Sequence, residues 1–194
     1  MAHSSAITDM KEEAVRQLLK CKMFVDALDA KEIKDVDELI GTHIFTYPIN
    51  PEYHENPKTF LMITTRIPKI MKNDNKMYAH PRLVIDIVSH MDHMKIDRTQ
   101  FDTGCNRNDF ISQILDHLFN SDRTSERKFG FFGQLDLVEN NEGYFTKDWV
   151  FRHMEFETLD FNKALCDCKT EEFFGKYGYE VPDYQELEIG KKIR

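Results

Sequence analysis

The chain has 194 residues and a formal net charge of −8, since 26 Lys and Arg stand against 34 Asp and Glu. This length suits one domain with an added arm, because single cores usually run to roughly 100–200 residues, and a hydrophobic fraction of 41% excludes a disordered chain. The excess of acids argues against a nucleic-acid binder that neutralises phosphates, and no apolar run approaches the roughly 20 residues that span a bilayer.

The first predicted element is a helix over residues 8–30. Apolar residues recur there in steps of three and four, which places them on one helix face: Met10, Ala14, Leu18, Cys21, Val25 and Leu28. Thr8 and Asp9 are the expected N-caps. Residues 31–40 follow as a short helical or turn segment, which ends at Gly41.

Two strands are predicted next. Residues 43–47 and 59–67 are β-branched and aromatic runs, and each of them is stopped by a proline. Residues 48–58 contain three prolines, so we expect an irregular loop between the strands. Residues 69–81 are predicted to form a second, polar loop.

The clearest strand prediction covers residues 82–90, with the sequence RLVIDIVSH. Leu83, Ile85 and Ile87 alternate to one face, and Val84 and Val88 lie on the other. Apolar side chains on both faces are typical of a strand with neighbours on either side. We therefore expect this strand at the centre of its sheet.

A second helix is predicted from the N-cap Asn108 to Asn120. The apolar stripe that would face the core has the spacing i, i+3, i+4, i+7: Ile111, Ile114, Leu115 and Leu118.

The next segments predict a charged loop, a strand and a turn: residues 121–128, 129–138 and 140–143. Residues 149–161 predict a last strand of roughly 13 residues, which exceeds the usual 5 or 6. We expect this strand to project beyond the sheet of a monomer.

This order of elements predicts an α+β fold, in which a mostly antiparallel sheet of four to five strands carries two main helices on one face. Residues 1–161 form that domain. Residues 162–194 are polar with scattered aromatics, and we expect them to form a C-terminal arm.

The side chains that most favour chemistry are Asp86, His90, Asp92 and His93. Imidazoles and carboxylates together can hold a divalent metal, so an alternative function is a metal-dependent, nuclease-like enzyme. However, His90 and His93 are three apart at a strand end, and they share a face only if the chain turns there. The simpler interpretation is a polar loop at the end of the strand.

The four cysteines predict reduced thiols in a soluble intracellular protein. Cys166 and Cys168 form a C-x-C that offers half of a zinc site, but no second pair with suitable spacing occurs. The sequence also lacks a G-x-S-x-G nucleophile motif, a P-loop and a dinucleotide fingerprint. We therefore expect a protein that is not an enzyme and has no cofactor, no metal and no membrane partner.

Several segments together carry a resemblance to a known family. They are an N-terminal helix, then FLMITTRIP after a proline-bearing loop, RLVIDIVSH, NRNDFISQILDHLF, and closing strands with GQLDLVENN and WVFRHMEFETLDF. In this order and texture, residues 60–161 resemble the tail-terminator, or head-to-tail joining, proteins of tailed bacteriophages.

The resemblance implies a structural subunit of the virion, made in the host cytoplasm. Such a subunit forms a homohexameric ring at the neck, which ends the tail tube and joins it to the head connector. DNA would pass through the lumen of the ring without specific binding.

The candidate interface residues are aromatic side chains of the last strand and the arm: Trp149, Phe151, Phe156, Phe173, Phe174, Tyr177, Tyr179 and Tyr184. Aromatic residues are enriched in protein interfaces, and a polar segment with aromatics between charges is typical of a segment that orders on a neighbour. A further alternative is a small adaptor that binds a host protein through residues 162–194.

Overall fold

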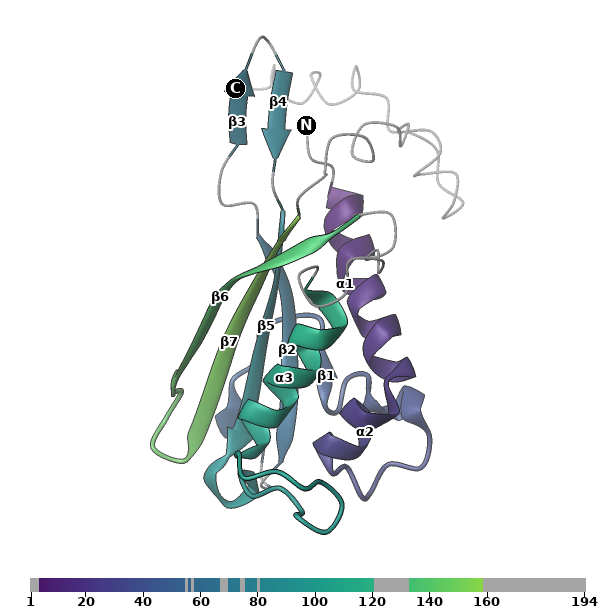
Figure 1. Cartoon of the computed structure of the whole chain (residues 1–194), viewed down its shortest axis with the longest axis vertical. Coiled ribbons are helices and arrows are strands. Elements are labelled where there is room, and N and C mark those ends of the chain that lie inside the picture. The colour runs from purple at the N-terminus through teal and green to yellow at the C-terminus, as the bar shows by residue number, and fades with distance from the viewer. Residues whose placement is uncertain are drawn as a thin grey trace, which may run out of the picture.

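The computed structural model describes residues 4–54, 56, 58–66, 70–73, 76–79, 81–120 and 133–158. Within these residues, a five-stranded sheet carries three α-helices on one face (Figure 1). The strands, in sheet order, are β1 (Ile44–Phe45), β2 (Thr59–Arg66), β5 (Arg82–His90), β7 (Trp149–Thr158) and β6 (Leu135–Tyr144). The pairing is antiparallel except between β1 and β2, which confirms the predicted α+β fold.

The central strand is β5, as its sequence predicts. It pairs with β2 on one side and with β7 on the other. Leu83, Ile85 and Ile87 are buried against the helices, while Val84 and Val88 are buried on the opposite face. Strand β5 therefore contributes to the packing on both faces of the sheet.

The predicted N-terminal helix is divided in two. Helix α1 spans Ser4–Lys20 and helix α2 spans Lys22–Leu28, with Cys21 in an extended conformation between them. The first helix begins earlier than the predicted caps, so Thr8 lies inside it. The apolar stripe nevertheless stays on one side, because Leu18 and Leu28 both belong to the main core.

A short turn follows as predicted. Residues Val36–Leu39 form a single turn of 3-10 helix, η1, whose N-cap Asp35 accepts a hydrogen bond from the backbone N–H of Asp37. Gly41 comes two residues after this turn with a φ of +80°, a conformation that glycine adopts without steric cost.

Helix α3 spans Arg107–Phe119, and its N-cap is Asn106 instead of the predicted Asn108. The Asn106 side chain accepts a hydrogen bond from the backbone N–H of Asp109 at 2.9 Å, which satisfies one of the free donors at the helix start. Asn108 is the second residue of the helix; it is buried, and its side chain accepts a hydrogen bond from the Ser89 hydroxyl of β5. Asn120 closes the helix as predicted.

Arg107, the first residue of α3, is almost fully buried and connects three parts of the chain. Its guanidinium donates to the carbonyl of Ala27 at 2.5 Å, to that of His93 at 2.8 Å and to that of Lys95 at 2.8 Å. It also lies 3.3 Å from the carboxylate of Asp29, which caps α2. Arg107 thus fixes the end of α2 against the segment that follows β5.

The prediction of a polar loop over residues 69–81 is wrong. This segment contains a two-stranded hairpin, β3 (Ile70–Asn73) and β4 (Lys76–Ala79), which stands beyond the end of the large sheet (Figure 1). The lysines and asparagines of the segment obscure its strand signal, because they interrupt the alternation of apolar residues that identifies a half-buried strand.

The last two strands, β6 and β7, differ from the prediction in two ways. Residues 140–143, predicted as a turn, lie inside β6, and the reversal comes after Tyr144, where Phe145 N–H donates to the carbonyl of Trp149. Strand β7 is described over Trp149–Thr158 and pairs with β5 over residues 149–157 and with β6 over residues 150–158. These residues therefore lie within the sheet, and residues 159–161 of the predicted strand lie outside the described residues.

The apolar residues form two clusters, one on each face of the sheet. The main core lies between the sheet and the helices and includes Phe24, Leu61, Ile85, Leu115 and Phe156. The second cluster lies on the helix-free face and contains Phe45, Phe60, Met62, Val88 and Trp149. None of the described helices combines the length and the apolar character that a membrane span requires.

Candidate functional site

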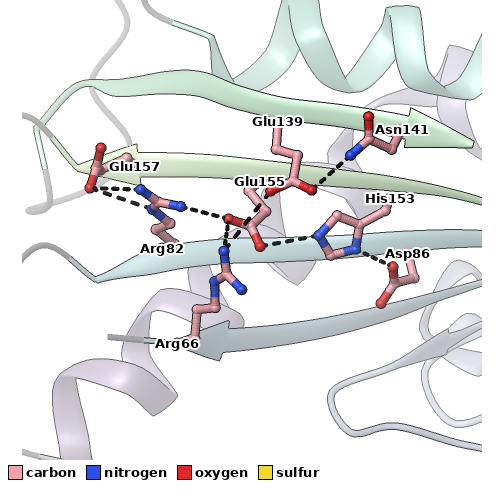
Figure 2. Close-up of polar contacts among 8 residues, drawn as sticks. All are labelled: Arg66, Arg82, Asp86, Glu139, Asn141, His153, Glu155 and Glu157. Atoms are coloured by element: carbon pink, nitrogen blue, oxygen red, sulfur yellow. Dashed lines mark hydrogen bonds and ion pairs between the residues drawn. The ribbon is translucent and has the colours of Figure 1, made fainter. Parts of the chain in front are cut away.

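The helix-free face of the sheet carries a network of polar side chains next to the second apolar cluster (Figure 2). We call it the charged network; its members come from four adjacent strands and are Arg66, Arg82, Asp86, Glu139, Asn141, His153, Glu155 and Glu157. Side chains alternate between the two faces of a strand, so residues two apart on β7 share this face. The strand register then places Asp86 of β5 directly opposite His153, and Glu139 of β6 directly opposite Glu155.

Glu155 lies at the centre of the network, and its side chain is only 1% exposed. One carboxylate oxygen, Oε2, accepts from Arg66 Nη2 at 2.5 Å and from Arg82 Nη1 at 2.9 Å. Burial alone raises the pKa of the Glu155 carboxyl, but the hydrogen bonds from Arg82 and His153 outweigh it and leave the pKa below its ordinary value. Glu155 is therefore a buried carboxylate that its neighbours keep ionised.

His153 links Glu155 to the central strand. Its Nδ1 lies 2.6 Å from Asp86 Oδ1 and its Nε2 lies 3.1 Å from Glu155 Oε1. Burial lowers the pKa of the imidazole, yet the hydrogen bonds to Asp86 and Glu155 exceed that effect and raise it above the ordinary value. The imidazolium donates from both nitrogens, and the two carboxylates thereby fix the orientation of the ring.

Glu139 faces Glu155 across the strand pair, which brings two like charges together. A β-bulge between Leu137 and Glu139 shifts the register of β6 at this point, and such bulges redirect a side chain. Asn141 donates to Glu139 Oε1 at 2.7 Å, while Arg66 lies 4.0 Å from its other oxygen. One ligand atom each from Glu139, His153 and Glu155 lie within 4.8 Å of one another, so these three residues can hold a metal ion.

The residues of the alternative metal site, Asp86, His90, Asp92 and His93, do not come together in one place. Asp86 belongs to the charged network, whereas His90 lies at the end of β5, roughly 13 Å further along at about 3.3 Å per residue. His90 accepts from the backbone N–H of Asp92 and caps the short 3-10 helix η3 (Met91–His93). His93 instead faces Thr59 and Asp29. The simpler interpretation, a polar turn at the strand end, is confirmed.

Two of the predicted interface residues are buried inside the chain. Trp149 is 4% exposed within the second apolar cluster, and Phe156 is fully buried in the main core. Neither offers its side chain to another molecule in this arrangement, while Phe151 is half-buried against the second cluster. The other predicted interface residues and the C-x-C lie outside the described residues: Phe173, Phe174, Tyr177, Tyr179, Tyr184, Cys166 and Cys168.

Sequence reasoning missed most of the charged network, although one signal was present. His153, Glu155 and Glu157 alternate with apolar residues along β7, so a strand prediction already places them on one face. Their partners Arg66 and Asp86 are 67–89 residues away in the sequence. Only the strand order shows that these side chains meet.

The chain was also compared with known proteins. No curated protein and no solved structure matches it. Residues 13–158, which include all five strands of the large sheet, match the model of the YomW family. The chain therefore belongs to the YomW family, a phage-associated family named after an SPbeta-like gene product.

Proposed function

We propose that the protein is a structural subunit of a phage particle, which forms a homohexameric ring at the head–tail neck. In that position it would end the tail tube and join it to the head connector. The phage association of the family supports the setting, and the shape of the subunit supports the role.

The observation that carries the proposal is the β3–β4 hairpin. Its four paired positions run from Ile70 opposite Ala79 to Asn73 opposite Lys76, and within the described residues its strands pair with each other and with no other strand. A two-stranded hairpin is marginally stable in water unless it packs on something else. A hairpin that extends beyond its own sheet is suited to pack on the neighbouring subunit of a ring.

The turn between β6 and β7 provides a second surface. Tyr144 is 74% exposed and Phe145 is 44% exposed, and Val138, further along β6, is also exposed. Strand β6 is an edge strand of the described sheet; its first residues contact Asn120, and the rest of its outer edge lies beside no other described strand and can meet a neighbour. Exposed aromatic side chains beside an edge strand are typical of a surface that another protein covers.

The mass of the assembly in solution tests the proposal directly. We expect light scattering after gel filtration to give the mass of a hexamer of 23.0 kDa chains, about 138 kDa, and we expect rings in negative-stain micrographs. A strict monomer at tens of micromolar, with no rings in micrographs, contradicts the proposal.

A pair of variants locates the contact. Tyr144→Ser should shift the assembly toward smaller species, because it removes an aromatic side chain from the proposed contact. Tyr53→Ser is the matched control, since Tyr53 is 83% exposed on the short 3-10 helix η2 (Pro51–Tyr53), which is not part of the β6–β7 turn. Equal masses for the two variants would exclude the β6–β7 turn as a contact of the ring.

Deletion of residues 162–194 tests the part of the proposal that concerns the arm. If the arm binds a neighbouring subunit, the shortened chain keeps its circular dichroism spectrum and loses the ring. If the arm instead serves a host protein, the ring survives the deletion, and the aromatic residues of the arm are not ring contacts.

A further inference from the structure

We propose that Glu139, His153 and Glu155 bind one divalent transition-metal ion, Zn²⁺ before others, on the helix-free face of the sheet. The proposal is independent of the ring. It concerns a site that connects the edge strand β6 to its neighbour β7.

The three side chains are already close to the geometry of a metal site. The three ligand atoms already lie within 4.8 Å of one another, and two of them, His153 Nε2 and Glu155 Oε1, are 3.1 Å apart. Ligands about 2.0–2.2 Å from a Zn²⁺ ion in tetrahedral arrangement stand roughly 3.3–3.5 Å from each other. Only Glu139 has to approach, and its side chain is 39% exposed and sits on a bulge.

Neighbouring side chains hold two of the ligands in position. A metal-binding histidine usually donates its other ring N–H to a carboxylate, which fixes the tautomer and the orientation of the ring. Asp86 Oδ1 holds His153 Nδ1 in this way at 2.6 Å. Glu155 is fixed as well, because Arg66 and Arg82 hold its Oε2 and leave Oε1 directed at the imidazole.

The net charge of the network also favours a cation. The network contains four carboxylates and two guanidinium groups: Asp86, Glu139, Glu155, Glu157, Arg66 and Arg82. With a neutral imidazole the sum is −2, which a divalent cation balances. When the ion binds, the proton on His153 Nε2 leaves to solvent, and the nitrogen lone pair takes its place as a ligand.

The register of the sheet brings two of the ligands together. Glu139 and Glu155 are directly opposite on neighbouring strands, a placement in which like charges destabilise the pair. Within the described residues, the Arg66 guanidinium lies 4.0 Å from Glu139 and 2.5 Å from Glu155, and the His153 imidazole also lies near both carboxylates. A metal ion between the two carboxylates offsets this repulsion, because both carboxylates are attracted to the cation.

The donor set selects the class of metal. One imidazole nitrogen with two carboxylate oxygens suits Zn²⁺ and its neighbours in the first transition row, whereas Mg²⁺ and Ca²⁺ prefer oxygen ligands alone. Three protein ligands leave at least one coordination position for water or for a side chain from another chain.

The experiment is a titration of the full-length, chelator-treated protein with ZnCl₂, followed by calorimetry, and with CoCl₂, followed by visible absorption. Other thiols and imidazoles of the chain also take Zn²⁺, so the comparison between variants decides. We expect Glu139→Gln and His153→Gln to bind Zn²⁺ at least tenfold more weakly than the unmodified protein at one site per chain, and Asp86→Asn to lose about 10–100-fold.

Glu142→Gln is the matched control, because Glu142 lies on the same strand and pairs with Arg152 instead of the network. It should bind Zn²⁺ and Co²⁺ like the unmodified protein, and MgCl₂ should not displace either ion. Glu139→Gln keeps the test valid if His153→Gln does not fold, since Glu139 is partly exposed on an edge strand. Equal Zn²⁺ affinity and equal Co²⁺ spectra for Glu139→Gln and Glu142→Gln would overturn the proposal.

Discussion

Replacement of Arg107 by methionine should cost a large part of the stability of the fold. The guanidinium makes three hydrogen bonds of 2.5–2.8 Å to backbone carbonyls and one 3.3 Å contact to Asp29. Methionine fills a similar volume but donates to none of these acceptors. Each buried acceptor that is left without its hydrogen bond costs about 1–3 kcal/mol, so the three carbonyls together cost at least about 3 kcal/mol, which is a large share of the roughly 5–15 kcal/mol that holds a domain together.

Equilibrium unfolding in urea measures this cost. With a dependence of about 2 kcal/mol per molar urea, a loss of about 4 kcal/mol lowers the midpoint by about 2 M. Arg98→Met is the control, because Arg98 is exposed. Its free energy of unfolding should change by no more than about 0.5 kcal/mol.

A second variant separates the charge pair from the carbonyl bonds. Asp29→Asn keeps the left-handed backbone of the α2 cap, at a φ of +56°, and removes only the negative partner of Arg107. Because Asp29 is partly exposed, we expect a loss of less than about 1 kcal/mol. If Arg107→Met unfolds at the same urea concentration as Arg98→Met, the inference that Arg107 fixes α2 and the segment after β5 is wrong.

Two further predictions concern other parts of the fold. Burial, assisted by neighbouring positive charge, lowers the pKa of His43 to about 4. At mildly acidic pH the unfolded chain therefore binds a proton at His43 that the folded chain does not bind. The free energy of unfolding should therefore fall by about 2–3 kcal/mol from pH about 7 to pH about 4.5 through this group, and His43→Gln should make that pH dependence shallower; parallel curves would refute the assignment. On β6, a Cβ at Gly143 would stand 3.0 Å from the Phe151 ring, so Gly143→Ala should lower the free energy of unfolding by about 1 kcal/mol. Gly104→Ala, with no atom within 4 Å of its added Cβ, should leave the thermal midpoint almost unchanged, and similar midpoints for both variants would show that the ring yields freely.

The elements that the sequence predicts well are those in which one periodicity dominates. Strand β5 matches its predicted bounds, because apolar residues on both faces indicate a central strand. The apolar stripe of helix α3 predicts its position, although the N-cap is Asn106 and not the predicted Asn108. Two asparagines two residues apart are equivalent by sequence, and the packing of Asn108 against Ser89 decides between them.

The elements that the sequence misplaces depend on pairing. Residues 140–143 have the composition of a turn, yet they form part of β6 because β7 offers a full ladder beside them. The charged network is beyond local reasoning for the same reason: His153 and Glu155 acquire their partners from β2, β5 and β6. A sequence shows which face a charge occupies on its own strand, and the order of strands determines what it meets there.

The order of strands in the sheet also determines how long β5 lacks its second partner during synthesis. Strand β5 lies between β2, which precedes it closely, and β7, which begins about 60 residues after β5 ends. At roughly 5–20 residues per second, the ribosome takes about 3–12 seconds to deliver β7 after β5 is complete. During that interval β5 is an unpaired edge strand with apolar side chains on both faces. Such an edge can pair with a strand of another nascent chain on a neighbouring ribosome. We therefore expect the yield of folded protein to depend on how long β5 waits for its second partner.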